Sequence, residues 1–369
     1  LGPDKFAKGV NLHLQRYRHG NATADDFFRS LGEAAGDAKV VTAMRTFTDQ
    51  TGVPLVSAVE NAQGIALTQA RYRPLGVAAS APQTWMIPLC LARGENRSCS
   101  VMQGASVTVP KVAGNGPLMP NAGGAVYSRF RLDDAGWDQL IAAAATLPGK
   151  EALAVADSLW ADFDAGTASF ERVIAAARAL SRNPERLAVI ELGYRLKDLA
   201  SSALTEQQRT QYHALMLSIY GPRLTALGLN VKPGAHAREP TQAQALRQSL
   251  LPLVALEGRD PKLRAQLATA AAAYVGGDTQ ALDPAFRGVA LMVAVQERGA
   301  PFMTQLQGAM LKSTDSLFRQ HGAEALGAAN TPEQAQESLR LALAPGMQSL
   351  ETVQILFGLA IFALGYAAR

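Results

Sequence analysis

Residues 5–28, KFAKGVNLHLQRYRHGNATADDFF, decide how the N-terminal part of the chain folds. In the first half, apolar side chains recur at helical spacing and polar side chains fill the other face, which predicts an amphipathic helix. We expect Gly20 to be the C-cap of this helix, because glycine adopts the left-handed conformation without a steric penalty. Thr23 and Asp26 then have the spacing of a capping box at the start of a second helix. The stretch therefore predicts a helix, a tight turn and a second helix.

The same stretch carries a longer pattern, F-x-x-G-hydrophobic-x-x-Y-L-x-x-x-x-Y-G-N-A-T-x-x-D-hydrophobic. The residues that match it are Phe6, Gly9, Leu12, Leu14, Gly20, Asn21, Ala22, Thr23 and Asp26. Through them the chain resembles the zinc aminopeptidases of the aminopeptidase N and puromycin-sensitive type, in the segment that follows their active site. A second segment resembles the W-T-x-Q-x-G-x-P end of that family's catalytic domain, with Phe for Trp. Its matching residues are Phe47, Thr48, Gln50, Gly52 and Pro54.

The composition is that of a globular protein rich in helix. Of the 369 residues, 48% are hydrophobic and only 18% are charged, and the formal net charge is +4. That charged fraction lies below the usual quarter and suits a tightly packed fold. No run of Lys and Arg with interleaved aromatic residues is present, so nucleic acid is excluded as a partner. The most apolar run, residues 355–368, is too short to span a membrane comfortably and predicts a buried helix.

Between residues 54 and 132 the period of the apolar residues changes to two. Turn residues separate β-branched and alternating segments, and residues 61–64 and 94–97 have the composition of hairpin turns. We therefore expect a small β-sandwich. Near its end, Gly124, Tyr127 and Arg129 resemble the family's N-x-x-G-Y-Y-R segment, with the spacing off by one residue.

The chain has two cysteines, Cys90 and Cys99. If Gly94 and Glu95 form the turn of a hairpin, the cysteines lie directly opposite each other, where a cross-strand bond is allowed. The two alternatives are this disulfide and a pair of unreactive thiols. A disulfide would indicate a periplasmic or secreted protein, because reducing compartments keep thiols free. Without it, the sequence does not indicate a compartment.

From residue 133 to the end the sequence predicts helices almost throughout. One of them covers residues 301–319, and Gly221-Pro222 is among the breaks that we expect between helices. Short helices in series predict a HEAT-like superhelical stack, although we find no strict sequence repeat. Residues 282–343 resemble the C-terminal helical domain of the aminopeptidase family.

These segments, with the resemblance, predict a multidomain and mainly α protein. Residues 1–52 are expected to be the C-terminal helices of a thermolysin-like catalytic domain, and residues 53–132 the β-sandwich. Residues 133–369 are expected to be a HEAT-like helical domain. We expect the chain to be cut at both ends, since it opens inside a helix and stops just after an apolar run.

The family's zinc-binding motif H-E-x-x-H is absent from this sequence, as is its G-x-M-E-N segment. The five histidines are His13, His19, His213, His236 and His321. His236 and Glu239 have the spacing of a ligand pair, but they lie between prolines without a third ligand, so we expect a loop there. The sequence thus predicts no catalytic residue, no metal ligand and no cofactor in this chain. The resemblance implies zinc in an upstream catalytic domain.

Four basic residues are candidates for substrate contact by their position in the resembling stretch: Arg287, Lys312, Arg319 and Arg340. In the family the helical domain lines a chamber in which basic side chains can hold the C-terminal part of a peptide. The alternative for each is an ordinary solvated or salt-bridged side chain, because Lys and Arg normally lie exposed.

The resemblance implies a non-catalytic C-terminal part of a zinc aminopeptidase that shapes the substrate chamber. The implied partners are peptide substrates and the protein's own N-terminal and catalytic domains. An alternative of a different class is a stand-alone helical-repeat protein that binds or scaffolds a partner. A third is a pseudo-enzyme whose upstream domain has degenerated.

Overall fold

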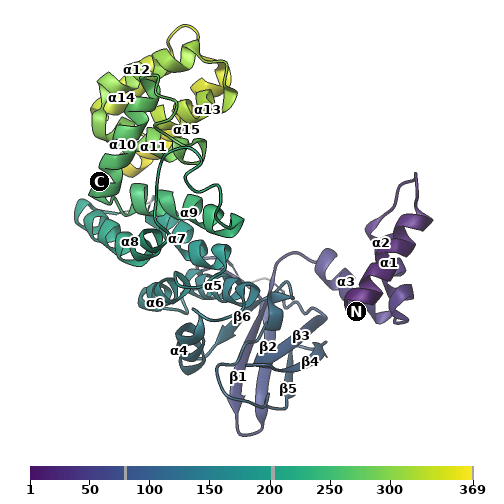
Figure 1. The fold of residues 1–369 in the computed structure, drawn as a ribbon. Helices are drawn as coiled ribbons and strands as arrows, with labels where there is room; N and C mark the ends of the chain where they lie inside the picture. Colours follow the sequence, from purple (N-terminus) through teal and green to yellow (C-terminus); the bar gives the residue numbers. More distant parts are fainter. Residues whose placement is uncertain (79–80, 201–203, 368–369) are drawn as a thin grey trace. The chain divides into compact units, whose positions relative to one another are not determined.

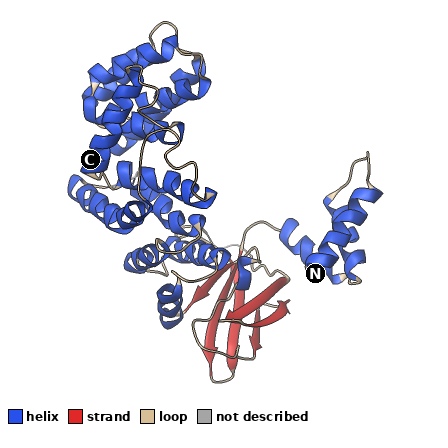
Figure 2. Cartoon of the chain, viewed as in Figure 1, coloured by secondary structure: helices blue, strands red, loops and turns tan. Residues whose placement is uncertain are grey.

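The computed structural model describes residues 1–78, 81–200 and 204–367, without the side chains of residue 206 and of residues 361–367. The chain divides into two compact units, Leu1–Asn183 and Pro184–Arg369. Helices make up most of the described chain, and the strands described here belong to the first unit (Figures 1 and 2). At this level the predicted mainly α fold with small sheets is confirmed.

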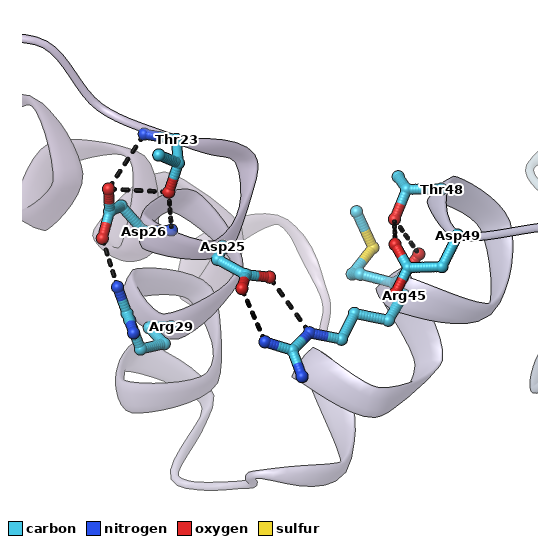
Figure 3. Close-up of polar contacts among 8 residues, drawn as sticks. Thr23, Asp25, Asp26, Arg29, Arg45, Thr48 and Asp49 are labelled. Carbon is cyan, nitrogen blue, oxygen red and sulfur yellow. Dashed lines mark hydrogen bonds and ion pairs between the residues drawn. The ribbon is translucent and has the colours of Figure 1, made fainter.

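Three helices open the first unit: α1 (Pro3–Arg16), α2 (Ala24–Ala35) and α3 (Lys39–Thr48). The predicted capping box is confirmed: the Asp26 amide donates to Thr23 Oγ1, and the Thr23 amide donates to Asp26 Oδ2 at 2.9 Å (Figure 3). The predicted C-cap is wrong, because His19 and not Gly20 takes the left-handed conformation, with φ of 60°. The chain leaves α1 earlier than expected, with Tyr17 as C-cap.

Close packing of α1 on α2 explains one glycine of the N-terminal pattern. A Cβ atom at Gly9 would lie 2.7 Å from Leu31 Cδ2 and 3.0 Å from Leu31 Cα, so a larger residue cannot enter here without movement. Helix α2 is joined to α3 by a bidentate pair, in which Arg45 Nε and Nη2 donate to Asp25 at 3.0 and 2.6 Å (Figure 3). The opening stretch therefore folds as part of a three-helix unit.

Six strands follow: β1 (Pro54–Asn61), β2 (Gly64–Arg71), β3 (Ile87–Arg93), β4 (Asn96–Met102), β5 (Ser106–Val109) and β6 (Arg129–Leu132). Four form a sheet in the order β5-β2-β1-β6, in which β6 runs parallel to β1. Strands β3 and β4 form a separate hairpin. Both predicted hairpin turns are confirmed. Cys90 lies directly opposite Cys99 across β3 and β4, with their Cα atoms 4.0 Å apart, and the two are joined in a disulfide.

A buried glutamine connects the two sheets. Gln69 of β2 is 7% exposed, and its side chain donates to the carbonyls of Trp85 and Gly104 at 2.9 and 2.8 Å. It also accepts from the Trp85 amide at 2.8 Å. The backbone that leads into β3 is thus fixed by one side chain of the larger sheet, as buried polar groups require.

Three helices complete the first unit: α4 (Asp134–Ala143), α5 (Gly149–Asp164) and α6 (Phe170–Leu180). Asp133 is the N-cap of α4, since its side chain accepts from the Gly136 amide. Asp162 of α5 is 2% exposed and accepts from Arg131 Nε of β6 at 2.7 Å and from Trp137 Nε1 of α4 at 3.1 Å. Burial raises the pKa of Asp162, and these two donors oppose that effect.

The second unit consists of α7 (Arg186–Ala200), α8 (Glu206–Leu227), α9 (Thr241–Pro252), the π-helical turn η2 (Leu253–Glu257), α10 (Pro261–Val275), the short η3 (Pro284–Phe286), α11 (Arg287–Arg298), α12 (Ala300–Lys312), α13 (Ser316–Leu326), α14 (Pro332–Ala342) and α15 (Ser349–Ala367). Gly221-Pro222 does not break a helix, because Pro222 lies inside α8. The expected helix at residues 301–319 is also wrong. Asp315 caps a new helix by accepting from the Leu317 and Phe318 amides.

The second unit contains a repeat that the sequence analysis missed. Three helical starts share the pattern D-x-x-[LF]-R, in residues 260–264, 283–287 and 315–319. In each copy the aspartate accepts from a backbone amide of the first turn, and the arginine four residues later is buried. The aspartate is a helix cap, so the repeat sets both the start of a helix and the direction of one long side chain.

Each arginine of the repeat donates to a carboxylate about thirty residues further along the chain. Arg264 reaches Glu297 at 2.6 Å, Arg287 reaches Asp315 at 3.0 Å, and Arg319 reaches Glu351 at 2.6 Å. These pairs connect α10 to α11, α11 to the start of α13, and α13 to α15. We call this series of three pairs the charge ladder. It joins neighbouring helices of the second unit through buried arginines. Of the three carboxylates, Glu351 is buried, whereas Glu297 and Asp315 are exposed.

The last helix is less buried than the sequence predicts. Ile355 and Leu359 of α15 are buried, but Val353 and Phe357 on the other side are 60% and 70% exposed. The expectation of a buried helix thus holds for one face in the part whose side chains are described. None of the described helices meets the length and apolarity that crossing a membrane requires.

Candidate functional site

Residues 1–78, 81–200 and 204–367 bring no three His, Cys, Asp or Glu side chains together in an arrangement that could hold a metal ion. The histidines are dispersed: His13 lies in α1, His213 in α8 and His321 in α13.

His236 is engaged in hydrogen bonds at both ring nitrogens. Its Nδ1 lies 2.7 Å from Glu239 Oε1, and its Nε2 accepts from the Asn230 amide at 2.9 Å. Nε2 must therefore be unprotonated, and Nδ1 carries the proton that it donates to Glu239. Neither nitrogen offers a free lone pair to a metal. Residues 236–239 thus form a hydrogen-bonded loop.

Arg319 uses its charge within the fold. It is 9% exposed and donates to both oxygens of Glu351 at 2.6 and 2.8 Å, and to the Met310 carbonyl at 2.7 Å. Glu351 is itself 4% exposed. A substrate carboxylate would have to displace a buried, bidentate partner to reach this guanidinium. The geometry supports the salt-bridged alternative for Arg319.

Arg287 lies in an aromatic setting. Its guanidinium carbon is 4.8 Å from the centre of the Tyr274 ring and 5.9 Å from that of Phe318, and Nη1 donates to Asp315. Aromatic rings that face a buried cation stabilise its charge through cation–π interactions. The Arg287 side chain is therefore a packing element between α10, α11 and α13.

Arg340 and Lys312 lie at the surface. Arg340 donates to Glu337 on the same helix, and Lys312 ends α12 with an exposed side chain. Each has a flexible side chain, so a negatively charged group in solution can approach it. Of the four basic candidates, these two are the ones whose charge stays accessible.

A groove with a volume of about 740 Å³ runs along α10 in the second unit. Its floor consists mainly of small side chains of α10, and its walls are the loops before α9 and before η3. The lining residues are Val231, Lys232, Pro233, Ala265, Gln266, Thr269, Ala270, Ala273, Asp278, Gln280 and Ala281. We call it the α10 groove. The floor has no bulky or charged side chain, so it leaves room for an extended peptide chain. The charged residues of the lining are Lys232 and Asp278.

A second cleft, of about 400 Å³, lies in the first unit between α5 and the segment before β6. It brings together Gly124, Tyr127 and Arg129, the three residues that resemble the N-x-x-G-Y-Y-R segment. Arg129 lies over the Tyr72 ring at 4.2 Å and pairs with Asp157 at 3.2 Å. The arginine of this cleft is therefore already paired.

The end of η2 holds a partly buried carboxyl that no sequence pattern indicates. The Glu257 carboxyl accepts from Tyr212 Oη at 2.9 Å. The backbone carbonyl oxygen of Glu257 lies 2.5 Å from His213 Nδ1. Burial raises the pKa of Glu257 and lowers that of His213, so both groups are driven towards their neutral forms. Met216 and Tyr220 of α8 are fully buried and belong to the core of the second unit.

The functional signal that sequence reasoning missed is the charge ladder. The D-x-x-[LF]-R pattern is visible in the sequence, and a search for caps followed four residues later by arginine would have found it. The acidic partners could not be found in this way, because they lie 33, 28 and 32 residues after their arginines and no single spacing connects all three pairs.

The model of the ERAP1-like C-terminal domain family matches residues 118–367. Aminopeptidase 2 of Candida albicans is 26% identical over 298 residues, which cover 78% of this chain and 31% of that protein. Alanine/arginine aminopeptidase of Saccharomyces cerevisiae is 35% identical over 92 residues, 25% of this chain and 11% of that protein. Glutamyl aminopeptidase of Homo sapiens is 29% identical over 152 residues, 39% of this chain and 16% of that protein. The chain thus spans at most about a third of these relatives, and the predicted resemblance to aminopeptidases is confirmed.

Proposed function

Because the chain belongs to the ERAP1-like C-terminal domain family, we propose that it is the non-catalytic C-terminal part of a zinc aminopeptidase and forms a wall of its substrate chamber. The observation that supports this most directly is the family match, which covers all the described helices from α4 to α15. The relatives are aminopeptidases by name. In this proposal the zinc site and the catalytic residues lie in a segment that precedes residue 1.

The domain assignment belongs to the same proposal. Residues 1–52 would complete a thermolysin-like catalytic domain, and residues 53–132 would be a β-sandwich that separates it from the helices. Residues 133–369 would be the HEAT-like domain. The charge ladder suits this role, because in each pair a buried arginine connects one helix of the second unit to another.

We place the peptide-facing surface at the α10 groove. Its volume of about 740 Å³ is in the range of ligand-binding clefts, and its floor presents small side chains to an extended peptide. Among the four basic candidates, Lys312 and Arg340 keep accessible charges. Arg287 and Arg319 stabilise the wall itself.

Peptide binding by the isolated chain tests this placement. A fluorescently labelled ten-residue peptide should bind the chain, and Ala273→Trp should weaken binding because Ala273 is an exposed residue of the groove floor. Ala300→Trp is the matched control, since Ala300 is exposed on α12 and outside the groove. Equal effects of the two substitutions, or no binding at all, would refute the groove as the peptide-facing surface.

A further inference from the structure

One wall of the cleft in the first unit is a single face of α5. Lys150, Leu153, Ala154 and Asp157 all line this cleft, which we call the α5 cleft. Their spacing of three, four and seven residues places the four side chains on the same side of the helix. The wall therefore has a cation at one end, a carboxylate at the other, and apolar side chains between them.

Hydrogen bonds hold the opposite wall in place. The buried Asn121 side chain donates to the Val126 carbonyl at 3.0 Å and accepts from the Val126 amide at 3.1 Å. The Gly123 amide donates to Glu151 of α5 at 2.7 Å, which ties this segment to the helix that it faces. A cleft whose walls are already fixed loses little conformational freedom when a ligand binds.

The charged groups at the two ends of the cleft are accessible. Lys150 is exposed, and among the described residues no carboxylate or carbonyl group pairs with its ammonium group. The Asp157 side chain is 41% exposed, and Arg129 donates to it at 3.2 and 3.4 Å. Because a carboxylate has about four acceptor sites, Asp157 can accept from a second cation as well.

The distance between these ends sets the length of a ligand that contacts both. Along the axis of α5, Lys150 and Asp157 lie about 10 Å apart, since a helix rises about 1.5 Å per residue. An extended chain spans about 3.3–3.6 Å per residue, so about three residues cover this distance. The part of the cleft between the ends is lined by half-buried apolar side chains. These belong to Val53, Val126, Leu153 and Ala154.

We propose that the α5 cleft binds a peptide of about three apolar residues with free termini, its carboxylate at Lys150 and its ammonium group at Asp157. The reverse direction would bring like charges together at both ends, so the charges fix the orientation. The cleft volume of about 400 Å³ lies in the range of ligand-binding sites. A longer peptide cannot keep both termini beside their partners. This site goes beyond the proposed function, which places peptide at the α10 groove of the second unit.

Calorimetric titration of the purified chain with the tripeptide leucyl-alanyl-leucine tests the site. The free tripeptide should bind, and amidation of its C-terminus or acetylation of its N-terminus should each weaken binding about tenfold, because each removes one charge-assisted contact. In Lys150→Gln the free acid and the amide should bind equally. Lys8→Gln in α1 is the matched control, since it replaces another exposed lysine and must keep the preference for the acid.

A further variant separates this site from the α10 groove. Ala273→Trp fills the groove and should leave the affinity for the tripeptide unchanged. Loss of tripeptide binding in this variant would assign the binding to the groove and overturn the α5 cleft as the site. The same conclusion follows if the tripeptide does not bind, if either terminal charge has no effect, or if the preference for the acid persists in Lys150→Gln. None of these outcomes bears on the aminopeptidase assignment, because the site is argued from the first unit alone.

Discussion

Truncating Arg319 tests whether the charge ladder holds the helical unit together. Arg319→Ala removes two bonds to Glu351, one to the Met310 carbonyl and a longer one to the Gly346 carbonyl. It leaves the Glu351 carboxylate, which is 4% exposed, with a hydrogen bond from the Gln348 amide. Breaking a buried pair by removing one partner costs about 3–5 kcal/mol. For a unit of this size the midpoint of thermal unfolding falls by about 2–4 °C per kcal/mol, so we expect a decrease of about 10 °C.

The chain offers an internal reference for this experiment. Its three tryptophans, Trp85, Trp137 and Trp160, all lie in the first unit. Far-UV circular dichroism follows the helices of both units, whereas tryptophan fluorescence follows the first unit alone. Arg319→Ala should lower the part of the circular dichroism transition that comes from the second unit and leave the fluorescence transition in place. If the two transitions prove inseparable, the shift of the joint midpoint is the quantity to compare.

Two further variants make the test specific. Arg340→Ala removes an exposed pair with Glu337 and should change the midpoint little, because exposed pairs contribute little. Arg319→Met combined with Glu351→Leu removes both charges and should recover most of the lost stability. A decrease for Arg319→Ala no larger than that for Arg340→Ala would refute the ladder as a stabilising feature.

Three other predictions follow from local geometry. The Thr23 amide and hydroxyl hold the pKa of Asp26 well below its usual range. The ionised Asp26 therefore stabilises α2 at neutral pH, and this stabilisation is lost as the pH falls below about 4. Asp26→Asn should remove the loss of helical circular dichroism that the protonation of Asp26 causes in acid. Cys99→Ser removes the disulfide between Cys90 and Cys99, which are nine residues apart, and should destabilise the first unit by about 2–3 kcal/mol. Urea unfolding followed by tryptophan fluorescence measures this change. An unchanged midpoint would contradict a stabilising disulfide. Gly124→Ala should destabilise more than Gly123→Ala, because both glycines have positive φ but only at Gly124 would a Cβ lie 2.5 Å from the Lys150 carbonyl oxygen.

Local chemistry explains which parts of the fold the sequence predicts. The capping box of Thr23 and Asp26 and the hairpin turns depend on residues within four positions of each other, and all were predicted correctly. The prediction at Gly20 failed because α1 ends earlier, with Tyr17 as C-cap, and the left-handed residue of the turn is His19. The helix at 301–319 failed because the cap at Asp315 was overlooked.

The candidate site was harder to predict, because the state of a charge depends on partners far away in sequence. Arg287, Arg319 and Arg340 look alike in a list of basic residues. Their burial and acidic partners separate them: Glu351 lies 32 residues from Arg319, whereas Glu337 lies three from Arg340. Only the second partner could be guessed from helical spacing. The α10 groove has no sequence signal, since alanines are common throughout the chain.

The most direct test of the central claim is the activity of the isolated chain. The purified 369 residues, supplied with zinc, are incubated with chromogenic aminoacyl substrates of alanine, arginine and glutamate. Our account predicts hydrolysis at the rate of buffer alone, because the catalytic machinery is proposed to precede residue 1. Hydrolysis above that rate that follows the chain through purification and is abolished by a zinc chelator would contradict the account.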